Sequence, residues 1–299
     1  NTMCEQLDSI IETVQIHTPD LLTFADTEFT FPEDQYYNLS SPPENPLLER
    51  LQNLLYGRCY CKNFTLDQGP NPRFNGMDYR LVRKLSQANH SRKLWDPGWE
   101  ILRITSSDDL VISKGDDIRH LSSDIATSLG DEPPEVGKVI SFLLDKESYS
   151  SLPGFYAIYG ESRLDEYEDR DLLRIYFNLQ IDGGAVMISL VSRIFNRFKI
   201  PFMFKCPNHP DQYFRRDAGV LYIHKKDYRL SAELLESMYE DIMPHLERDI
   251  PLFTKLLAPG IGLAEDPGPT TSFGYHRCWL LAKGFWASYI EGVSSFDDR

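Results

Sequence analysis

Long apolar runs are missing from this sequence of 299 residues. No stretch of about 18 consecutive apolar residues occurs, so we expect no membrane-spanning helix. We also expect no secretory signal, because residues 1–16 carry three acidic side chains where a signal peptide has a basic start and a continuous apolar block. These features predict a cytoplasmic protein that does not bind membranes.

Cysteine is scarce and irregularly spaced. The five cysteines are an odd number, and Cys59 and Cys61 are one residue too close together for the usual pair of zinc ligands, which would also need a second pair. We expect all five to be reduced thiols, as is usual in the cytoplasm. The sequence therefore indicates no metal site, and we expect no cofactor.

Motifs of the common nucleotide-binding and hydrolytic enzymes are absent as well. The chain has no GxxxxGKS/T phosphate loop, no GxSxG nucleophile elbow, no HExxH zinc motif and no kinase-like HRD or DFG. Gly183-Gly184 lacks the strand and the further glycines of a dinucleotide loop, so it favours a flexible entry into a helix.

Charge is present but unevenly distributed. The formal net charge of −14 does not favour nucleic acid as a partner, since neutralising its phosphates needs clustered lysine and arginine. Residues 190–229, in contrast, contain nine basic and three acidic side chains. This basic island favours a local site for a small anion. A solvated face of ordinary elements would give the same pattern.

The first part of the chain predicts mainly helices. Asn45 is a candidate N-cap with Pro46 in the first turn, and leucines follow at helical spacing up to residue 55. A second helix is expected over residues 78–88, and strands over 99–105 and 110–113. The run Asp131-Glu132-Pro133-Pro134 predicts a boundary between a docking or support region, residues 1–134, and a second domain, residues 135–299.

The second part predicts strands over residues 154–159, 172–179, 202–206 and 219–224. Helices are expected over residues 185–197, 232–246 with Ser231 as N-cap, and 275–290, with a loop over 260–269. Because helices and strands alternate without a regular βαβ rhythm, we expect an α+β fold. Its mixed or antiparallel sheet would have helices packed on it.

The second part also contains short blocks in a distinctive order. They are Pro153-Gly154-Phe155-Tyr156, Arg174-Ile175-Tyr176-Phe177-Asn178-Leu179, Pro201-Phe202-Met203-Phe204-Lys205-Cys206, Arg215-Arg216-Asp217-Ala218, Val220-Leu221-Tyr222, Pro251-Leu252-Phe253-Thr254-Lys255, Leu257-Ala258-Pro259-Gly260, Gly262-Leu263-Ala264-Glu265-Asp266-Pro267, Ser272-Phe273-Gly274 and His276-Arg277-Cys278. Over residues 152–285 this series resembles the HopA-type effector domain. That domain occurs in type III effectors of plant pathogens, as the lyase component of class V lanthipeptide synthetases, and in thioamitide gene clusters. Residues 1–130 show no such block.

The resemblance implies a phosphoserine/phosphothreonine lyase, which is a carbon–oxygen lyase acting on phosphate without a metal. A separate kinase-like protein would phosphorylate a precursor peptide, and the lyase would then eliminate phosphate to leave dehydroalanine or dehydrobutyrine. A cyclase would be a further partner in such lanthipeptide or related peptide biosynthesis. The alternative is a non-catalytic effector or scaffold of the same family that binds a phosphopeptide or a protein. A true type III effector would be secreted into host cells.

The chemistry of elimination needs a base near Cα, cations that hold the leaving phosphate, and a proton donor. Lys205 is the candidate base, because its apolar neighbours in sequence would favour the neutral amine, although a lysine at a strand end would look the same. His276 is the candidate proton donor, with a buried structural histidine as the alternative, and Lys255 is a further catalytic candidate in an expected tight loop.

Four arginines are candidates for binding the phosphate: Arg174, Arg215, Arg216 and Arg277. One of the two adjacent arginines is expected to pair with Asp211 or Asp217 instead. Tyr156 and Tyr176 are weaker candidates for substrate contacts, because most tyrosines at this spacing are core or rim residues. Glu265-Asp266 is expected to cap a loop, and His209 and His224 are expected at the surface.

Overall fold

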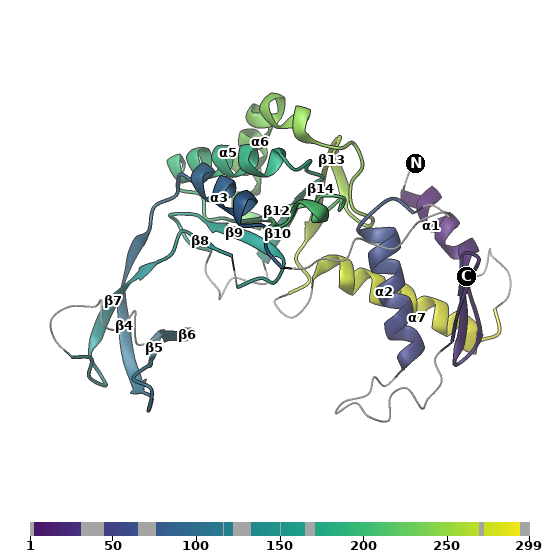
Figure 1. The fold of residues 1–299 in the computed structure, drawn as a ribbon, viewed down its shortest axis with the longest axis horizontal. Coiled ribbons are helices and arrows are strands. Elements are labelled where there is room, and N and C mark those ends of the chain that lie inside the picture. The colour runs from purple at the N-terminus through teal and green to yellow at the C-terminus, as the bar shows by residue number, and fades with distance from the viewer. Residues whose placement is uncertain are drawn as a thin grey trace.

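The computed structural model describes residues 3–30, 45–64, 76–115, 117–121, 133–149, 151–164, 171–268 and 272–293. At its centre lies a seven-stranded sheet in the order β13-β14-β10-β12-β11-β9-β8, in which every neighbouring pair is antiparallel (Figure 1). Its strands are β8 (Glu147–Ser148), β9 (Phe155–Tyr159), β10 (Leu172–Phe177), β11 (Met203–Pro207), β12 (Gly219–His224), β13 (Lys255–Ala258) and β14 (Ile261–Glu265).

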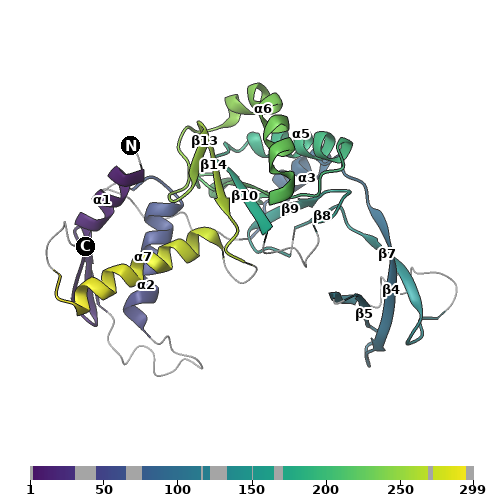
Figure 2. The same ribbon diagram turned by 180° about the vertical axis from the view of Figure 1, so that it is seen from behind.

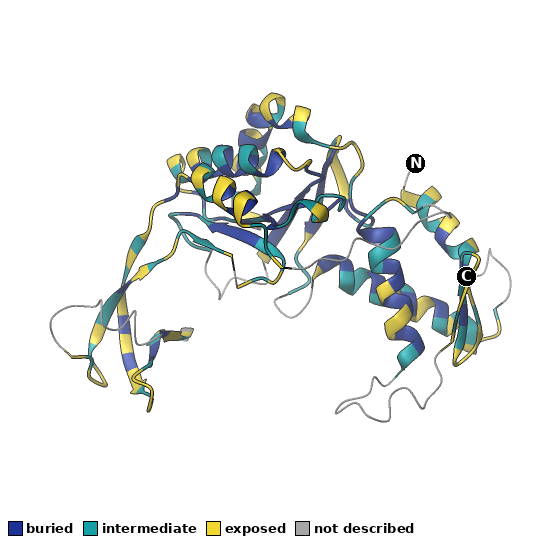
Figure 3. Cartoon of the chain, in the orientation of Figure 1, coloured by how far each residue is buried: buried dark blue, intermediate teal, exposed yellow. Residues whose placement is uncertain are grey.

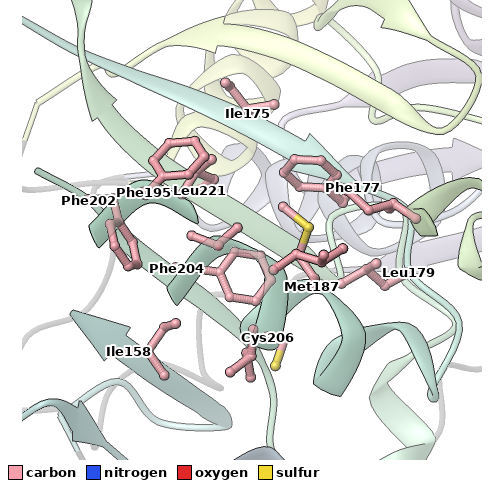
Figure 4. Packing of buried hydrophobic residues seen from close by; sticks show 14 of the residues in the cluster. Ile158, Ile175, Phe177, Leu179, Met187, Phe195, Phe202, Phe204, Cys206 and Leu221 are labelled. Atoms are coloured by element: carbon pink, nitrogen blue, oxygen red, sulfur yellow. The ribbon is translucent and has the colours of Figure 1, made fainter. Parts of the chain in front are cut away.

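Three helices cover one face of this sheet: α3 (Tyr79–Ala88), α5 (Gly183–Arg197) and α6 (Tyr228–Ile242). Successive side chains of a strand point to opposite faces, so alternate residues of β10 and β11 face these helices. Phe177 and Phe204 meet Met187 of α5 there, in a fully buried cluster (Figure 4). The solvent-facing sides of the same helices are exposed (Figure 3). This apolar layer therefore fixes which residues of each strand point to the other face.

One flanking unit combines the two ends of the chain (Figure 2). It contains α1 (Met3–Thr13), β1 (Val14–Thr18), β2 (Leu21–Phe24), β3 (Thr27–Thr30), α2 (Pro46–Leu55), the π-helical turn η2 (Tyr56–Tyr60) and α7 (Phe273–Ile290). As expected, Asn45 caps α2, where its Oδ1 accepts from the Leu48 N–H at 3.1 Å. This unit shares a second apolar core with β10, β12 and β14, through Tyr176, Val220, Tyr222 and Ala264.

The other flanking unit is a four-stranded antiparallel sheet in the order β6-β5-β4-β7. Its strands are β4 (Leu94–Ile104), β5 (Leu110–Lys114), β6 (Asp117–Leu121) and β7 (Val139–Leu144). It has a small core of its own around Trp99 and Phe142, whose ring centroids are 5.4 Å apart. Both flanking units extend from the central sheet on the side away from α3, α5 and α6 (Figures 1 and 2).

The expected α+β class and the antiparallel sheet are confirmed, and most expected elements lie within a few residues of their observed bounds. Short helical turns connect some of them: η4 (Pro210–Gln212), η5 (Lys225–Asp227) and η6 (Met243–His245). None of the described helices is both long and apolar enough to cross a membrane.

Three expectations were wrong. The part before residue 134 is not mainly helical, because strands β1–β6 accompany helices α1–α3. Residues 261–265 form strand β14 rather than a loop, since Gly260 makes a left-handed turn at φ 78° that returns the chain antiparallel to β13. Helix α6 begins at Tyr228, so Ser231 is buried inside it and is not its N-cap.

Residues before and after position 134 share both large apolar cores. Leu81, Val82 and Leu85 of α3 pack with β10 and α5 in the first core, and α2 packs with α7 in the second. Asp131 and Glu132, half of the expected boundary, lie outside the described residues. The expected domain boundary at residue 134 therefore separates segments that pack together in the same two apolar cores.

Candidate functional site

Basic and aromatic side chains gather on the face of the central sheet opposite α5 and α6. Arg174 of β10 lies opposite Tyr222 of β12, and Met203 of β11 lies on the other side of Tyr222, so their side chains share one face. Lys205 follows Met203 by two residues and therefore points to the same face. The Arg174 guanidinium carbon is 5.1 Å, and the Lys205 Nζ 5.5 Å, from the centroid of the Tyr222 ring.

Phe155 of β9 extends this group toward the 207–219 connection. Its ring centroid is 4.6 Å from Lys205 Nζ and 5.8 Å from the guanidinium carbon of Arg215. We call Arg174, Tyr222, Lys205, Phe155 and Arg215 the cation–aromatic strip. Three of the basic candidate residues, Arg174, Lys205 and Arg215, thus lie in one continuous chain of contacts, joined through two rings.

Lys205 differs from the two arginines of the strip. Its side chain is half-buried, and no carboxylate of the described residues forms an ion pair with it. Its near neighbours on this face are the π-faces of Phe155 and Tyr222, which attract a cation but cannot accept a proton from it. Lys205 is therefore available to a ligand in a way that a salt-bridged lysine is not.

Arg215 is held by a bidentate ion pair with Asp217. Arg215 Nε donates to Asp217 Oδ1 at 2.8 Å and Nη2 donates to Oδ2 at 2.9 Å. Although burial by itself disfavours the charge, Asp217 and Tyr56 hold the pKa of Arg215 well above its usual value. The expected pairing of one adjacent arginine with Asp217 is thus seen for Arg215, which remains charged in the strip.

Arg174 forms a second bidentate pair, with Asp266 at the end of β14. Arg174 Nε and Nη2 donate to the two carboxylate oxygens at 2.8 and 2.9 Å. The exposed fractions of the two side chains are only 9% and 6%. Asp266 also accepts from the Gly268 N–H at 2.9 Å, so it caps the following loop as expected. The charge of Arg174 is therefore compensated by a buried carboxylate.

A pocket of about 210 Å³ opens beside the strip. It is lined by Pro153, Gly154, Phe155, Pro207, Gln212 and Arg215. Proline and phenylalanine give it an apolar wall, and Arg215 gives it a charged one. A larger pocket of about 550 Å³ lies at the turn formed by residues 133–138, where Glu135 and Lys138 are the charged lining residues. The smaller pocket is therefore the one that adjoins the cation–aromatic strip.

Three candidate residues lie away from the strip. Tyr156 is fully buried on the α5 face, where its hydroxyl donates to Glu147 Oε2 at 2.5 Å. Lys255 is exposed on edge strand β13 opposite Leu263, which packs toward the α5 face, so it is neither in a loop nor near Lys205. Arg216 is buried and bonds to the Ile250 carbonyl at 2.9 Å and to Gln6 and Asn63, which ties α1 to the 250 loop.

His276 and Arg277 belong to α7, and Tyr176 packs against the start of that helix. Tyr176 shares the Arg174 face of β10, and its ring is 6.1 Å from that of Phe273, which the Arg277 guanidinium contacts at 5.1 Å. His276 has a buried Nδ1 that makes no hydrogen bond to any described residue. No hydrogen bond or ion pair among the described residues joins His276 to Lys205 or Arg215.

The sequence interpretation missed several residues of this site. Phe155 and Tyr222 belong to the quoted blocks, and strand alternation from Arg174 and Lys205 would have placed Tyr222 beside them. His224, expected at the surface, is only 2% exposed and follows Tyr222 by two residues on β12. Tyr56 gave no local signal, because it reaches Arg215 across the fold.

Comparisons with known proteins place the chain in a family. A profile of the HopA1 effector protein family matches residues 146–295. A comparison with curated protein sequences gives no match. Two solved structures are similar to this chain. One is the effector protein from Pseudomonas syringae pv. tomato strain DC3000, with 15% identity, coverage of 85% of this chain and 83% of that chain, and a TM-score of 0.44. The other is the effector protein from Pseudomonas syringae pv. syringae strain 61, with 10% identity, coverage of 84% of this chain and 88% of that chain, and a TM-score of 0.44.

The matched segment is half of the chain and contains every residue of the cation–aromatic strip together with Asp217 and Asp266. The basic island, the quoted blocks and the family profile therefore coincide on one part of the molecule. This chain belongs to the HopA1 effector protein family.

Proposed function

We propose that this protein is a lyase that β-eliminates phosphate from phosphoserine or phosphothreonine in a peptide. One observation carries the proposal: Lys205, which has no ion-pair partner among the described residues, and Arg215, which lines a pocket, lie against the same ring of Phe155. Elimination needs a proton acceptor and an anion binder close together, and these two residues can supply them.

In the proposed step, the neutral amine of Lys205 takes the proton from Cα of the phosphorylated residue. The electron pair of the C–H bond forms the Cα–Cβ double bond, and the Cβ–O bond breaks with its electrons going to the departing phosphate. The products are a dehydroalanine or dehydrobutyrine residue and HPO4²⁻, because the phosphate takes up the proton that Lys205 removed from Cα and the neutral amine is regenerated. Atoms and charges balance without an oxidant or a co-reactant.

Arg215 supports departure of the phosphate in this proposal. A guanidinium has five N–H donors, and Asp217 and Tyr56 accept from three of those of Arg215. The two donors on Nη1 have no acceptor among the described residues. Cα and phosphorus of a phosphorylated side chain are separated by three bonds, so one residue can span from Lys205 to Nη1 of Arg215 along Phe155.

The peptide substrate and its kinase follow from the same chemistry. The chain contains no kinase motif, so we propose that a separate kinase-like protein phosphorylates a precursor peptide. The phosphorylated side chain would enter the pocket beside Arg215, and a cyclase would use the product. We further propose that His276 and Arg277, on the helix that packs over Tyr176, approach the phosphate only when a peptide is bound.

Mass spectrometry of a phosphopeptide incubated with the full chain tests the proposal. Elimination gives a product that is lighter than the unphosphorylated peptide by one water, whereas a phosphatase would restore the serine or threonine. A thiol added afterwards should couple to the dehydro residue and mark its position. If the protein binds the phosphopeptide but leaves its mass unchanged, the lyase proposal fails and a non-catalytic phosphopeptide-binding effector or scaffold is favoured.

A further inference from the structure

Arg215 has a partner from outside the part of the chain that matches the family. Its Nη2 donates to the hydroxyl oxygen of Tyr56 at 2.8 Å, across 159 residues of sequence. Tyr56 stands at the end of α2, whereas the family profile begins at residue 146. A side chain of the first fifth of the chain thus touches the anion-binding residue of the proposed site.

The Tyr56 hydroxyl is held rigidly. Its ring stacks on Tyr60 with centroids 5.5 Å apart and an angle of 12°, and Tyr275 of α7 meets it edge-on at 5.5 Å and 86°. The π-helical turn that carries both residues is closed by the Cys61 N–H, which donates to the Tyr56 carbonyl at 2.9 Å. Two rings and a backbone bond therefore fix where the hydroxyl oxygen lies.

The hydroxyl also stays neutral. Burial, followed by the nearby Asp217 carboxylate, raises the pKa of Tyr56 well above its usual value. A neutral hydroxyl can accept from Arg215 without cancelling its charge, whereas a second carboxylate at this place would compete with a phosphate for the guanidinium. Tyr56 thus orients Arg215, while the positive charge of Arg215 stays available to a ligand.

We infer that Tyr56 is a positioning residue of the phosphate site: together with Asp217 it turns Arg215 so that the two Nη1 donors are presented to the phosphate. The inference deepens the proposed function and rests on it for the identity of the anion. It also gives the N-terminal region a part in binding, beyond docking or folding. Tyr56 itself touches neither the phosphate nor the reacting carbon.

The test uses the full chain with Tyr56→Phe, which keeps the ring and its stacking. Tyr275→Phe is the matched control, because Tyr275 belongs to the same aromatic cluster and its hydroxyl bonds to Asn53 Oδ1, at 3.3 Å, rather than to Arg215. The anion probe is inorganic sulfate, followed through the concentration that gives half of the maximal rise in melting temperature. The turnover probe is a phosphopeptide, followed through KM and kcat separately.

For Tyr56→Phe we expect the half-maximal sulfate concentration and KM to rise about three- to tenfold, the effect of one lost hydrogen bond, with kcat nearly unchanged. Tyr275→Phe should change neither. In an Arg215→Lys background, whose amine lacks the guanidinium fork, Tyr56→Phe should add nothing, because the two residues act as one unit. This coupling is a readout that a merely structural tyrosine would not give.

Three outcomes decide the matter. A Tyr56→Phe variant that is less stable but has unchanged sulfate dependence and unchanged KM overturns the inference. An equal effect of Tyr56→Phe in the Arg215→Lys background overturns it too. If sulfate binding weakens as expected while the wild-type chain releases no phosphate from peptides, the positioning role stands and the lyase proposal is what fails.

Discussion

The Lys205 ammonium nitrogen lies 4.6 Å from the centroid of the Phe155 ring, on the face of the sheet opposite its main core. Cation–π contact holds the lysine beside the pocket, and no carboxylate of the described residues is paired with it. The proposed mechanism gives this lysine two roles, contact with an anionic substrate and removal of its Cα proton.

Replacing Lys205 should therefore separate catalysis from binding. We expect Lys205→Ala to lower the rate of phosphate elimination roughly 100- to 10,000-fold, the usual contribution of a general base, while phosphopeptide binding weakens only modestly. Lys205→Arg is the control that keeps a positive charge but cannot serve as a base at neutral pH, so it should be equally inactive. An active Lys205→Arg variant would show that the lysine supplies only charge.

Arg174 should matter for stability more than the sequence interpretation implied. Truncation to alanine leaves the Asp266 carboxylate buried without its partner, which costs about 3–5 kcal/mol of the free energy of unfolding. Asp266→Asn removes the carboxylate charge that accepts both hydrogen bonds from Arg174, so it should also lower the melting temperature. Urea denaturation of both variants measures the effect, and an unchanged midpoint would mean that this ion pair is dispensable.

Anions should stabilise the folded protein through Arg215. Sulfate or phosphate binds only the folded state, so either should raise the melting temperature more than chloride does at equal ionic strength. Arg215→Ala should remove most of this difference and weaken phosphopeptide binding by about 1.5–3 kcal/mol for a lost charge-assisted bond. The control is Arg229→Ala, which should behave like the wild type, because Arg229 is an exposed arginine paired with Glu233 on α6.

Alkaline pH should destabilise the fold through its buried thiols. Burial raises the pKa of Cys61 and of Cys206 to about 12, whereas a thiol in the unfolded chain has a pKa of about 8.5. The folded state thus binds more protons above pH 8.5, so this contribution to stability is complete below about 8.5 and declines as the pH rises toward 12. Melting temperatures measured from pH 8 to 10 should fall accordingly.

The same burial predicts which cysteine reacts in the native protein. Cys4 is exposed, and the other four are buried. Brief treatment with iodoacetamide, followed by peptide mass spectrometry, should modify Cys4 and leave the rest intact until denaturant is added. Rapid native labelling of Cys61 would contradict both this prediction and the stability argument for alkaline pH.

Removal of the first 130 residues should abolish cooperative folding. The remaining chain would lack Leu81, Val82 and Leu85 from one core and all of α2 from the other. Circular dichroism melting of the truncated chain should show no sharp transition, and co-expression of residues 1–134 should restore it. A truncated chain that melts sharply by itself would establish residues 135–299 as an independent domain.

What could be predicted from the sequence is mostly local. Helix α2 was foreseen because Asn45 and Pro46 mark its start and leucines recur on one side, and helix α3 because Tyr79, Val82 and Leu85 recur on one side. Strands β10 and β12 were foreseen from apolar runs. Each of these signals lies within about a dozen neighbouring residues, where capping and periodicity operate.

The rest of the site depends on contacts between distant segments. Asp266 meets Arg174 across 92 residues, and Tyr56 meets Arg215 across 159. No local pattern reveals such pairs, so neither Asp266 nor Tyr56 was expected as a partner of these arginines. Conversely, the placement of Arg174 and Lys205 on one face follows from strand alternation once β10, β11 and β12 are known to be neighbours.

The position of β10 in the sheet has a consequence for how the chain is made. All six of its residues are buried, and its two neighbours, β12 and β14, both come later in the sequence. During synthesis, Leu172–Phe177 leaves the ribosome as an apolar segment whose second hydrogen-bonding edge is not satisfied until Ile261–Glu265 has been translated. The central sheet therefore cannot be completed before β14 has been made, and until then we expect the apolar strand β10 to be a segment that a chaperone binds.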